Sequence, residues 1–368
     1  MHSLKQYINL FIFLFLSILI LSCSKEEDVI DDSAQDMDMS DLDEQIPDDS
    51  GNTDTPETLV LETGFTIDKE RMFTNLVLSD SEYNKFLSGE GDMRMVSNKA
   101  YEYFDDDFDF IIILNVEDSQ PDGLYFGLST PAKNDIQGLG RSVWDNTAAF
   151  GSAGKLKTVI HMPRTEYIRN GPFLHEIQHY WSNHGLIPTT AGGHWGYSSV
   201  GGQLGGFDEI EDLGSNTYRG LVDGEVGFGT VANGGNSVPY SNLELYAMGL
   251  IDTDELEAVT IAENPGSTSE FGVFTADALT VLTPEDIINE NGSRIPNPEN
   301  AQTEFNSLVV VISRDDIPQS KIDALNSNLE NFATKGDPDT SWGALFNFWK
   351  ATFGKASFDF EITNKHLK

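Results

Sequence analysis

The sequence predicts an α+β fold in which a twisted mixed sheet packs on one short helix and the C-terminal part is helical. Residues 110–116 (FIIILNV) are a run of apolar and mostly β-branched side chains, the pattern of a buried strand. Toward the C-terminus the pattern becomes helix, strand, helix, with a helix from Thr283, a strand over 305–312 and a helix over 320–333. These observations place one body at residues 59–368.

Breakers and periodicity define the elements in the first half of this body. A short helix is expected at 82–88. Residues 156–162 (LKTVIHM) alternate in polarity and stop at Pro163, which predicts a strand. At the edge of a sheet this proline costs no ladder hydrogen bond, so we expect the strand to border a cleft, where a peptide could pair with it.

Capping residues predict the helices that follow. Asn170 or Gly171 can cap a helix over 172–183, because Pro172 suits the first turn. Ser241 and Gly249 bracket a helix over 242–248. The aromatic-rich stretch 342–353 (WGALFNFWKATF) predicts a final helix with a core-facing side. The division of the body is left open, with a C-terminal lobe from about residue 270 as the alternative to a single domain.

The N-terminus predicts a lipoprotein signal peptide over residues 1–22. Its apolar run, 8–21, falls short of the roughly 20 residues that span a bilayer and is typical of a signal-peptide core. The run ends in ILSC at 20–23, which resembles a lipobox, so Cys23 is the expected lipidation site. The alternative is an ordinary secretory signal with an incidental cysteine. Cys23 is the chain's only cysteine, which excludes a disulfide framework.

Residues 23–58 predict a lipidated, acidic and disordered tether. Between Lys25 and Glu57 there are 14 acidic residues against one lysine, a composition that cannot bury enough apolar surface to fold. The stretch SKEED after Cys23 resembles the surface-export signal of Bacteroidetes-type lipoproteins. We therefore expect an outer-membrane lipoprotein exposed at the cell surface, which contacts the membrane only through its lipid. A calcium-binding or partner-binding tail is the alternative.

Charge and composition exclude one class of partner. The chain carries a net charge of −38, and the body after the tether keeps an excess of acidic residues. Nucleic acid binding depends on neutralising phosphates with Lys and Arg, so nucleic acid is not an expected partner. With no cysteine after residue 23, any metal must be held by histidines and carboxylates.

The stretch HEIQH at 175–179 carries the chemistry of a metal site. On an α-helix, His175 and His179 differ by only about 40° around the axis, so both imidazoles face one metal ion. Glu176 lies one position further on, close enough to act as general base on a water molecule activated by the metal. Zn²⁺ is the expected ion, because H-E-x-x-H on a helix is typical of zinc peptidases.

The third ligand is less certain than the first two. His184 lies about 180° away if the helix continues to Gly185, and a histidine there also complements the helix dipole. His194 can return to the metal, because glycines and Pro188 let the intervening chain double back. Glu244, on the helix over 242–248, is the alternative third ligand, and it could instead orient His194. Tyr197 and Tyr246 are candidate oxyanion stabilisers by their closeness to these motifs.

Four stretches of the chain carry a resemblance: GPFLHEIQHYW, HWG, YSNLELYAMGL and the stretch from Thr283 to Ile312. Together they resemble a group of bacterial secreted, zincin-like zinc metallopeptidases. The similarity spans about 101–353, with Gly196 in place of a common serine. The resemblance implies a zincin-like fold, ligand roles for His175 and His179, and the base role for Glu176. It implies hydrolysis of peptide or protein substrates. A non-catalytic surface binding lipoprotein on the same scaffold, or a hydrolase of non-peptide amides, are the alternatives.

Overall fold

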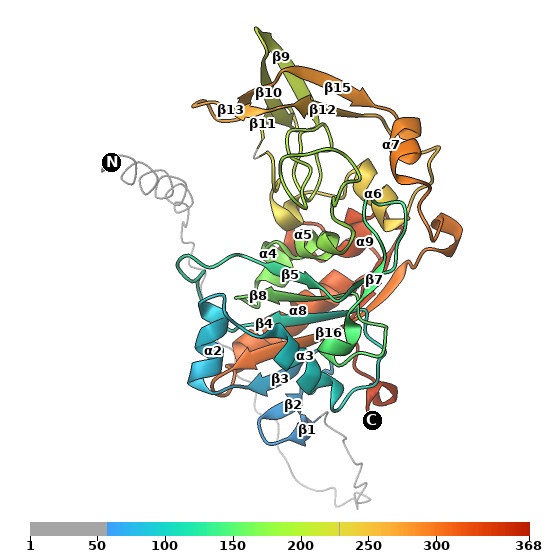
Figure 1. The fold of residues 1–368 in the computed structure, drawn as a ribbon. Coiled ribbons are helices and arrows are strands. Elements are labelled where there is room, and N and C mark those ends of the chain that lie inside the picture. The colour runs from blue at the N-terminus through green and yellow to red at the C-terminus, as the bar shows by residue number, and fades with distance from the viewer. Residues whose placement is uncertain (1–56, 228) are drawn as a thin grey trace, which may run out of the picture. The chain divides into compact units, whose positions relative to one another are not determined.

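The computed structural model describes residues 57–227 and 229–368, which all fall in one unit, Thr55–Lys368. The predicted signal peptide, the lipidation site Cys23 and nearly all of the tether lie outside the described residues. Within the described ranges, no helix has both the length and the apolar content needed to cross a membrane. The architecture is a mixed α+β arrangement of sheets and helices, as the sequence predicts (Figure 1).

An eight-stranded sheet organises the molecule, in the order β1-β2-β3-β16-β4-β8-β5, with β17 paired to β16. The central strands β3, β16, β4 and β8 run parallel, whereas β1, β2 and β5 pair antiparallel. The bounds are β1 (Leu59–Glu62), β2 (Phe65–Ile67), β3 (Thr74–Val77), β4 (Phe110–Leu114), β5 (Leu128–Pro131), β8 (Thr158–Met162), β16 (Glu304–Ser313) and β17 (Ser357–Asp359). The strands predicted at 110–116, 156–162 and 305–312 are therefore present as β4, β8 and β16.

One expectation about this sheet is wrong. The strand at 156–162 is not an edge strand, because β8 has β4 on one side and β5 on the other. The free edge belongs to β5, whose sequence LSTP is too short and too polar to be recognised as a strand. β8 carries the buried side chains of an interior strand, and Pro163 follows its last residue without disturbing the ladder.

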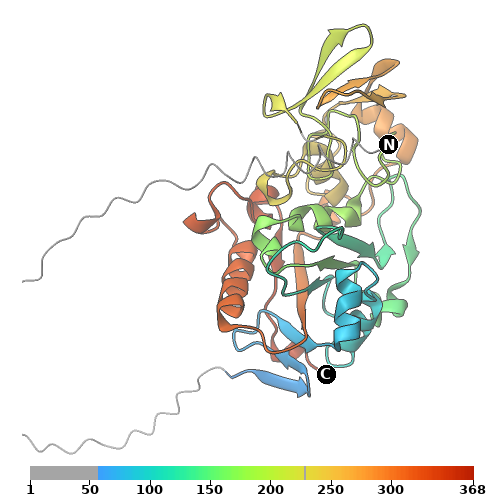
Figure 2. The same ribbon diagram turned by 90° about the vertical axis from the view of Figure 1, so that its left-hand side faces the viewer.

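Helices cover both faces of the main sheet (Figure 2). All five β4 side chains are buried, and they alternate between two cores. Ile111 and Ile113 pack toward α2 (Asp80–Leu87) and α3 (Met93–Tyr101). The other three β4 side chains pack in the core that holds α5, α6 and α8. The short helix predicted at 82–88 is confirmed as α2.

The remaining helices agree with the sequence in most places. The bounds are α4 (Tyr167–Asn170), α5 (Phe173–Gln178), α6 (Asn242–Met248), α7 (Pro284–Asn291), α8 (Gln319–Ala333) and α9 (Phe348–Ala351), with 3₁₀ turns η1 (Thr147–Phe150), η2 (His179–Trp181), η3 (Gly235–Ser237), η4 (Pro298–Asn300), η5 (Thr340–Trp342) and η6 (Asn364–His366). The single helix expected over 342–353 is wrong. The Asn347 side chain instead donates to three carbonyls and caps the short α9.

The sequence did not predict the smaller sheets, and those formed by strands between Glu209 and Leu282 lie beyond α5 and α6 (Figure 1). One has five strands and packs Phe207, Tyr218 and Phe274 in a small core of its own. The five strands are β9 (Glu209–Gly214), β10 (Thr217–Val222), β11 (Glu225–Val226), β13 (Gly266–Ser267) and β14 (Val273–Thr275). Two further sheets have two strands each: β12 (Val259–Glu263) with β15 (Ala278–Leu282), and β6 (Lys133–Asn134) with β7 (Trp144–Asp145). These strands are short and few of their residues are fully buried, so they carry no long apolar run.

Candidate metal centre

Helix α5 carries the HEIQH stretch and is anchored on one side by apolar packing. Leu174, Ile177 and Trp181 are buried in the core shared with the main sheet. The first turn is capped from outside the helix, because Leu174 N donates to Asn236 Oδ1 at 2.9 Å. The Asn236 amide in turn donates to the carbonyls of Ile168 and Arg169. This packing turns the opposite side of α5 toward the cleft.

The helix ends earlier than the sequence predicts. After Gln178 it tightens into η2 and ends at Trp181, rather than continuing to about residue 183. Asn183 explains the stop, since its side-chain oxygen accepts from the backbone N–H groups of Gly185 and Ile187. Such local side-chain bonds compete with helix hydrogen bonds. The predicted stop at Gly185 is therefore wrong.

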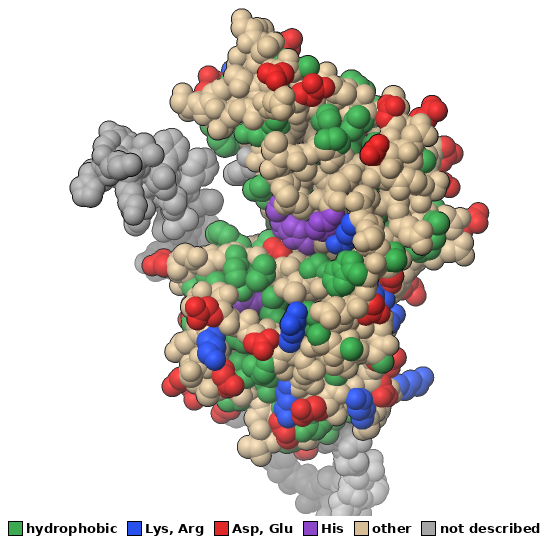
Figure 3. Space-filling view, in the orientation of Figure 1, with side chains coloured by type: hydrophobic (Ala, Val, Ile, Leu, Met, Phe, Trp, Pro, Cys, Tyr) green, Lys and Arg blue, Asp and Glu red, His purple; other side chains and the backbone are tan. Residues whose placement is uncertain are grey.

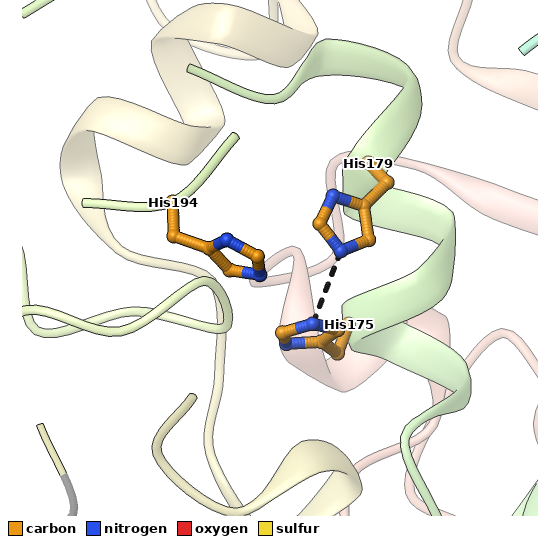
Figure 4. A group of neighbouring side chains, drawn as sticks. All are labelled: His175, His179 and His194. Carbon is orange, nitrogen blue, oxygen red and sulfur yellow. Dashed lines mark hydrogen bonds between the residues drawn. The ribbon is translucent and has the colours of Figure 1, made fainter. Parts of the chain in front are cut away.

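Three histidines converge on the side of α5 that faces the cleft. His175 and His179 come from α5 and η2, and His194 comes from the loop after Gly193 (Figure 4). The potential ligand atoms of the three side chains all lie within 4.8 Å of one another. The His175 and His179 Nε2 atoms are 3.2 Å apart. These three side chains are close enough to hold one metal ion, which is the geometry that His194 was predicted to complete.

Hydrogen bonds to backbone carbonyls determine which ring nitrogen of His175 and of His194 is the donor, and they leave the other nitrogen free to bind a cation. His175 Nδ1 lies 2.7 Å from the Gln203 carbonyl, and His194 Nδ1 lies 2.8 Å from the Gly192 carbonyl. A carbonyl oxygen only accepts, so each Nδ1 is the donor, and in the neutral form of each ring Nε2 then keeps the lone pair. Those lone pairs belong to the converging cluster. A cation at its centre would relieve their mutual repulsion.

Burial keeps the helix histidines neutral. It lowers the pKa of His175 to about 4, an effect that the Gln203 carbonyl opposes, and it holds the pKa of His179 well below its usual value. Both rings are therefore neutral, with a single N–H each, at neutral pH in the absence of metal. Neutral imidazole is the form that binds a metal ion.

Glu176 lies beside the cluster in a position with little water. Its side chain is 4% exposed, and burial raises the pKa of its carboxyl to about 8. The main chain before β5 passes directly over it, because a Cβ at Gly127 would lie 2.5 Å from Glu176 Oε1. A carboxyl whose pKa lies near neutrality can both take up and release a proton at that pH. Gly127 was not predicted as a site residue.

The cluster opens into two adjoining cavities that share Gly127, His175 and Glu176. The smaller, of about 590 Å³, lies along β5 and also reaches His179, His184 and His194. The larger, of about 830 Å³, extends toward α4 and the loop around Gly234. In the space-filling view, histidine side chains lie in a hollow of the surface (Figure 3). The two cavities form one cleft with the histidine cluster and Glu176 at their junction.

Glu244, the alternative third ligand, lies outside the cluster. Its fully buried carboxylate accepts four hydrogen bonds of 2.9–3.0 Å, which occupy both oxygens. The donors are Trp195 Nε1 and the backbone N–H groups of Gln203, Leu204 and Ser241. Burial raises the pKa of Glu244, and these donors oppose the rise. Glu244 thus holds Trp195, next to His194, together with Gln203, whose carbonyl binds His175.

The other predicted residues lie apart from the cluster. His184 Nε2 is 2.6 Å from Ser182 Oγ, and the ring lines only the smaller cavity. Tyr197 packs against Phe274 in the small core, with ring centroids 4.7 Å apart. Tyr246 is buried in α6 and lines neither cavity. Among the described residues, the structure gives neither tyrosine access to the cleft.

Sequence reasoning missed the residues that position the ligands. Gln203 acts through its main chain, and Asn236 contacts α5 from more than 60 residues away, so neither has a local pattern. Trp195 stood next to a candidate ligand, which was the only signal available. Comparison of the chain with protein-family models, with curated proteins and with solved structures finds no match. The resemblance to zincin-like peptidases therefore stays a prediction from the residues.

Proposed function

We propose that this protein is a zinc-dependent metallopeptidase with a zincin-like fold, which hydrolyses peptide bonds with Glu176 as general base. One observation carries the proposal: three imidazoles with converging lone pairs adjoin a buried carboxyl in an open cleft. A nucleophile, a base and access for a substrate are thereby combined at one point.

The donor set favours zinc. His175, His179 and His194 offer three imidazole nitrogens and no carboxylate, and three protein ligands with one open position are typical of catalytic zinc. Imidazole also suits copper, nickel and iron, so metal analysis must decide among them. When bound, zinc supplies a Lewis acid that polarises the substrate carbonyl and lowers the pKa of water.

The chain's own residues would perform the remaining steps. Glu176 accepts a proton from the attacking water and then donates it to the leaving amine. The carbonyls of Gln203 and Gly192 hold the His175 and His194 rings in orientation through both steps. The free edge of β5 offers unpaired main-chain groups, so an extended peptide can add as a further strand.

A non-catalytic surface binding protein on the same scaffold is the alternative. A purely structural zinc site is closed by a fourth protein ligand, whereas the cluster within the described residues contains three. A structural site also has no use for a buried carboxyl next to its ligands. Both observations favour the peptidase.

The test combines metal analysis with cleavage of a broad peptide library by residues 24–368. We expect about one zinc per chain and cleavage that falls roughly 10²–10⁴-fold in Glu176→Gln, with zinc retained. His194→Ala should lose zinc, whereas the matched control His184→Ala should keep it. A protein that binds no metal, or that cleaves equally well as Glu176→Gln, contradicts the proposal.

The proposal includes anchoring at the outer membrane, exposed at the cell surface, through a lipid on Cys23. The expected outcome is that Cys23→Ser moves the protein from the membrane fraction into the soluble fraction. Protease treatment of whole cells should remove the native protein if it faces outward. Retention of Cys23→Ser in the membrane fraction would show another anchor.

A further inference from the structure

The larger cavity of the cleft has walls of a distinct kind, and we call it the Arg164 chamber. It is bounded on one side by aromatic and aliphatic side chains and on the other by glycine-rich main chain. The side chains that matter here are Phe126, Tyr167 and Leu345, together with Arg164. Phe126 is 60% exposed, so this wall offers apolar surface to a ligand.

Arg164 lines the chamber with much of its hydrogen-bonding capacity unused. Its guanidinium carbon lies over the Tyr167 ring, 5.2 Å from the ring centroid. Its Nε is 3.5 Å from Glu166 Oε2, but both atoms lack a hydrogen-bond partner among the described residues. The ion pair is therefore loose, and the arginine fork is not engaged by a carboxylate in good geometry.

The charge of the cleft differs from that of the chain. The chain has 22 Lys and Arg against 60 Asp and Glu. Among the described residues that line the two cavities, Arg164 is the only Lys or Arg, and Glu176 is the only acidic residue. Apart from the proposed metal ion, an anionic group that enters the cleft therefore meets one Lys or Arg side chain, placed in one of the two cavities.

We infer that the Arg164 chamber binds a carboxylate of the substrate, on the C-terminal side of the bond that is cleaved. This inference rests on the proposed peptidase function. Arginine is suited to the role because its planar fork matches a carboxylate through two parallel hydrogen bonds. Phe126, Tyr167 and Leu345 would pack the apolar part of the same residue.

The direction follows from the edge strand. From Leu128 to Pro131, β5 leads away from the Arg164 chamber and along the smaller cavity. Antiparallel pairing is the more stable ladder, and a peptide that pairs in this way runs from the smaller cavity toward the chamber. With Glu176 and His175 at the junction, the residues after the cleaved bond enter the Arg164 chamber.

Two sources can supply such a carboxylate: an acidic side chain, or the free C-terminus of the substrate. Four matched peptides separate them, with glutamate or glutamine after the cleaved bond and with a free or an amidated C-terminus. Binding is measured on the zinc-loaded Glu176→Gln protein, and kcat/KM on the native protein. We expect one of the two carboxylates to improve both binding and kcat/KM about 10–100-fold.

Variants of Arg164 assign that preference to the chamber. Arg164→Gln should abolish the difference between matched peptides, and Arg164→Lys should restore only part of it, because lysine lacks the fork. Arg219→Gln is the charge-matched control, since Arg219 pairs with Glu211 and Glu270 on the small sheet. It should leave the preference unchanged.

The results distinguish this inference from the peptidase proposal. Equal binding and cleavage of all four peptides, or a preference that survives Arg164→Gln, would overturn the inference while leaving the peptidase intact. Loss of the preference in Arg219→Gln as strongly as in Arg164→Gln would show a general charge effect and would also overturn it. A protein that binds carboxylate peptides through Arg164 but cleaves none supports the chamber and refutes the peptidase.

Discussion

The two halves of the candidate metal centre are held in place in different ways. His175 and His179 belong to a continuous helical segment whose far side is buried with Leu174 and Ile177 in the main core. His194 belongs to the ligand loop, residues 182–206, which contains no helix or strand longer than an isolated bridge. Apolar side chains of that loop, Trp195 and Leu204 among them, are also buried in the main core. Its path, however, is set by buried hydrogen bonds, above all those that converge on Glu244.

This difference determines how each half can fail. Apolar packing is non-directional, and cores tolerate substitutions that conserve volume. Buried hydrogen-bond partners are less forgiving, because each group left unpaired costs about 1–3 kcal/mol. The helical half should therefore weaken gradually under mutation. The ligand loop should lose its order when a single buried carboxylate is removed.

Among the substitutions that test this contrast, removal of the Glu244 carboxylate should have the largest effect on stability. In Glu244→Ala, four N–H groups and a buried pocket lose their partner, so we expect the free energy of unfolding to fall by about 3–5 kcal/mol. Asp286→Ala is the matched control, because Asp286 occupies the same capping-box position at α7 but is exposed. This substitution should cost much less, because the hydrogen bonds that it removes are open to solvent. Urea unfolding measures both.

A second substitution at this position, Glu244→Gln, tests whether Glu244 positions the ligands. We expect zinc affinity to fall about 10–100-fold in Glu244→Gln, which keeps the shape but turns an amide toward backbone donors. Cobalt-substituted protein should show an altered visible spectrum, since the geometry of the site changes. Unfolding energies that match those of Asp286→Ala, together with unchanged metal affinity, would reduce Glu244 to an ordinary helix cap.

A second prediction concerns the helical half, where burial of the ionised Glu176 carboxylate lowers the stability of the fold. Burial raises the pKa of Glu176 to about 8 from 4.5 in the unfolded chain. The folded protein therefore binds more protons than the unfolded one between these values, so this group lowers stability as pH rises from 4.5 to 8. Metal-free Glu176→Gln lacks this loss. The free energy of unfolding of this variant should exceed that of the metal-free native protein by a few kcal/mol at pH 8, because each unit of raised pKa corresponds to about 1.4 kcal/mol.

The measurement is the difference in unfolding free energy between metal-free native protein and Glu176→Gln across this pH range. His175 has the opposite effect: its folded pKa of about 4 lies below the unfolded value, so its contribution is lost as pH falls below 6.5. That contribution is common to both proteins and cancels in the difference. Parallel curves would mean that the Glu176 carboxylate is ionised in the fold at the same pH as in the unfolded chain.

The predictability of the two halves follows from the same contrast. The spacing of His175 and His179 is a property of one helix, so local sequence was enough to bring them together. His194 reaches them through a loop, and sequence could only place it among the candidates with Glu244. The hydrogen bonds that separate their roles run from residue 244 to residues 195, 203 and 204. Such long-range partners leave no periodic signal in the chain.

The fold follows the same rule. Long segments with a clear pattern, such as the apolar β16 and the amphipathic α8, were predicted within a residue or two. Short elements were not, since β5 has four residues and depends on β8 for its identity. The stretch 342–353 has the composition of a helix but turns at Gly343, whose φ is +60°, before α9 begins. Tertiary contacts overrode local preference at these positions.

The smallest expected effect is also the most local test of the ligand loop. A Cβ at Gly202 would lie 2.2 Å from Glu244 Oε2 and 2.6 Å from Ser241 Oγ, whereas a Cβ at Gly192 would meet nothing within 4 Å. Neither glycine has a positive φ. Gly202→Ala should therefore cost about 1–3 kcal/mol through overpacking. Gly192→Ala should leave stability unchanged or raise it by up to about 1 kcal/mol, by restricting the unfolded chain.

Because both substitutions add one methyl group to the same loop, their difference isolates the close approach to Glu244. Thermal unfolding gives the stability change, and zinc titration shows whether the displaced carboxylate also disturbs His194. If Gly202→Ala matches Gly192→Ala in both measurements, the loop can move away from Glu244 at little cost. The hydrogen bonds to Trp195 and Leu204 would then be weaker constraints than the apolar packing of α5, and the contrast between the two halves would not hold.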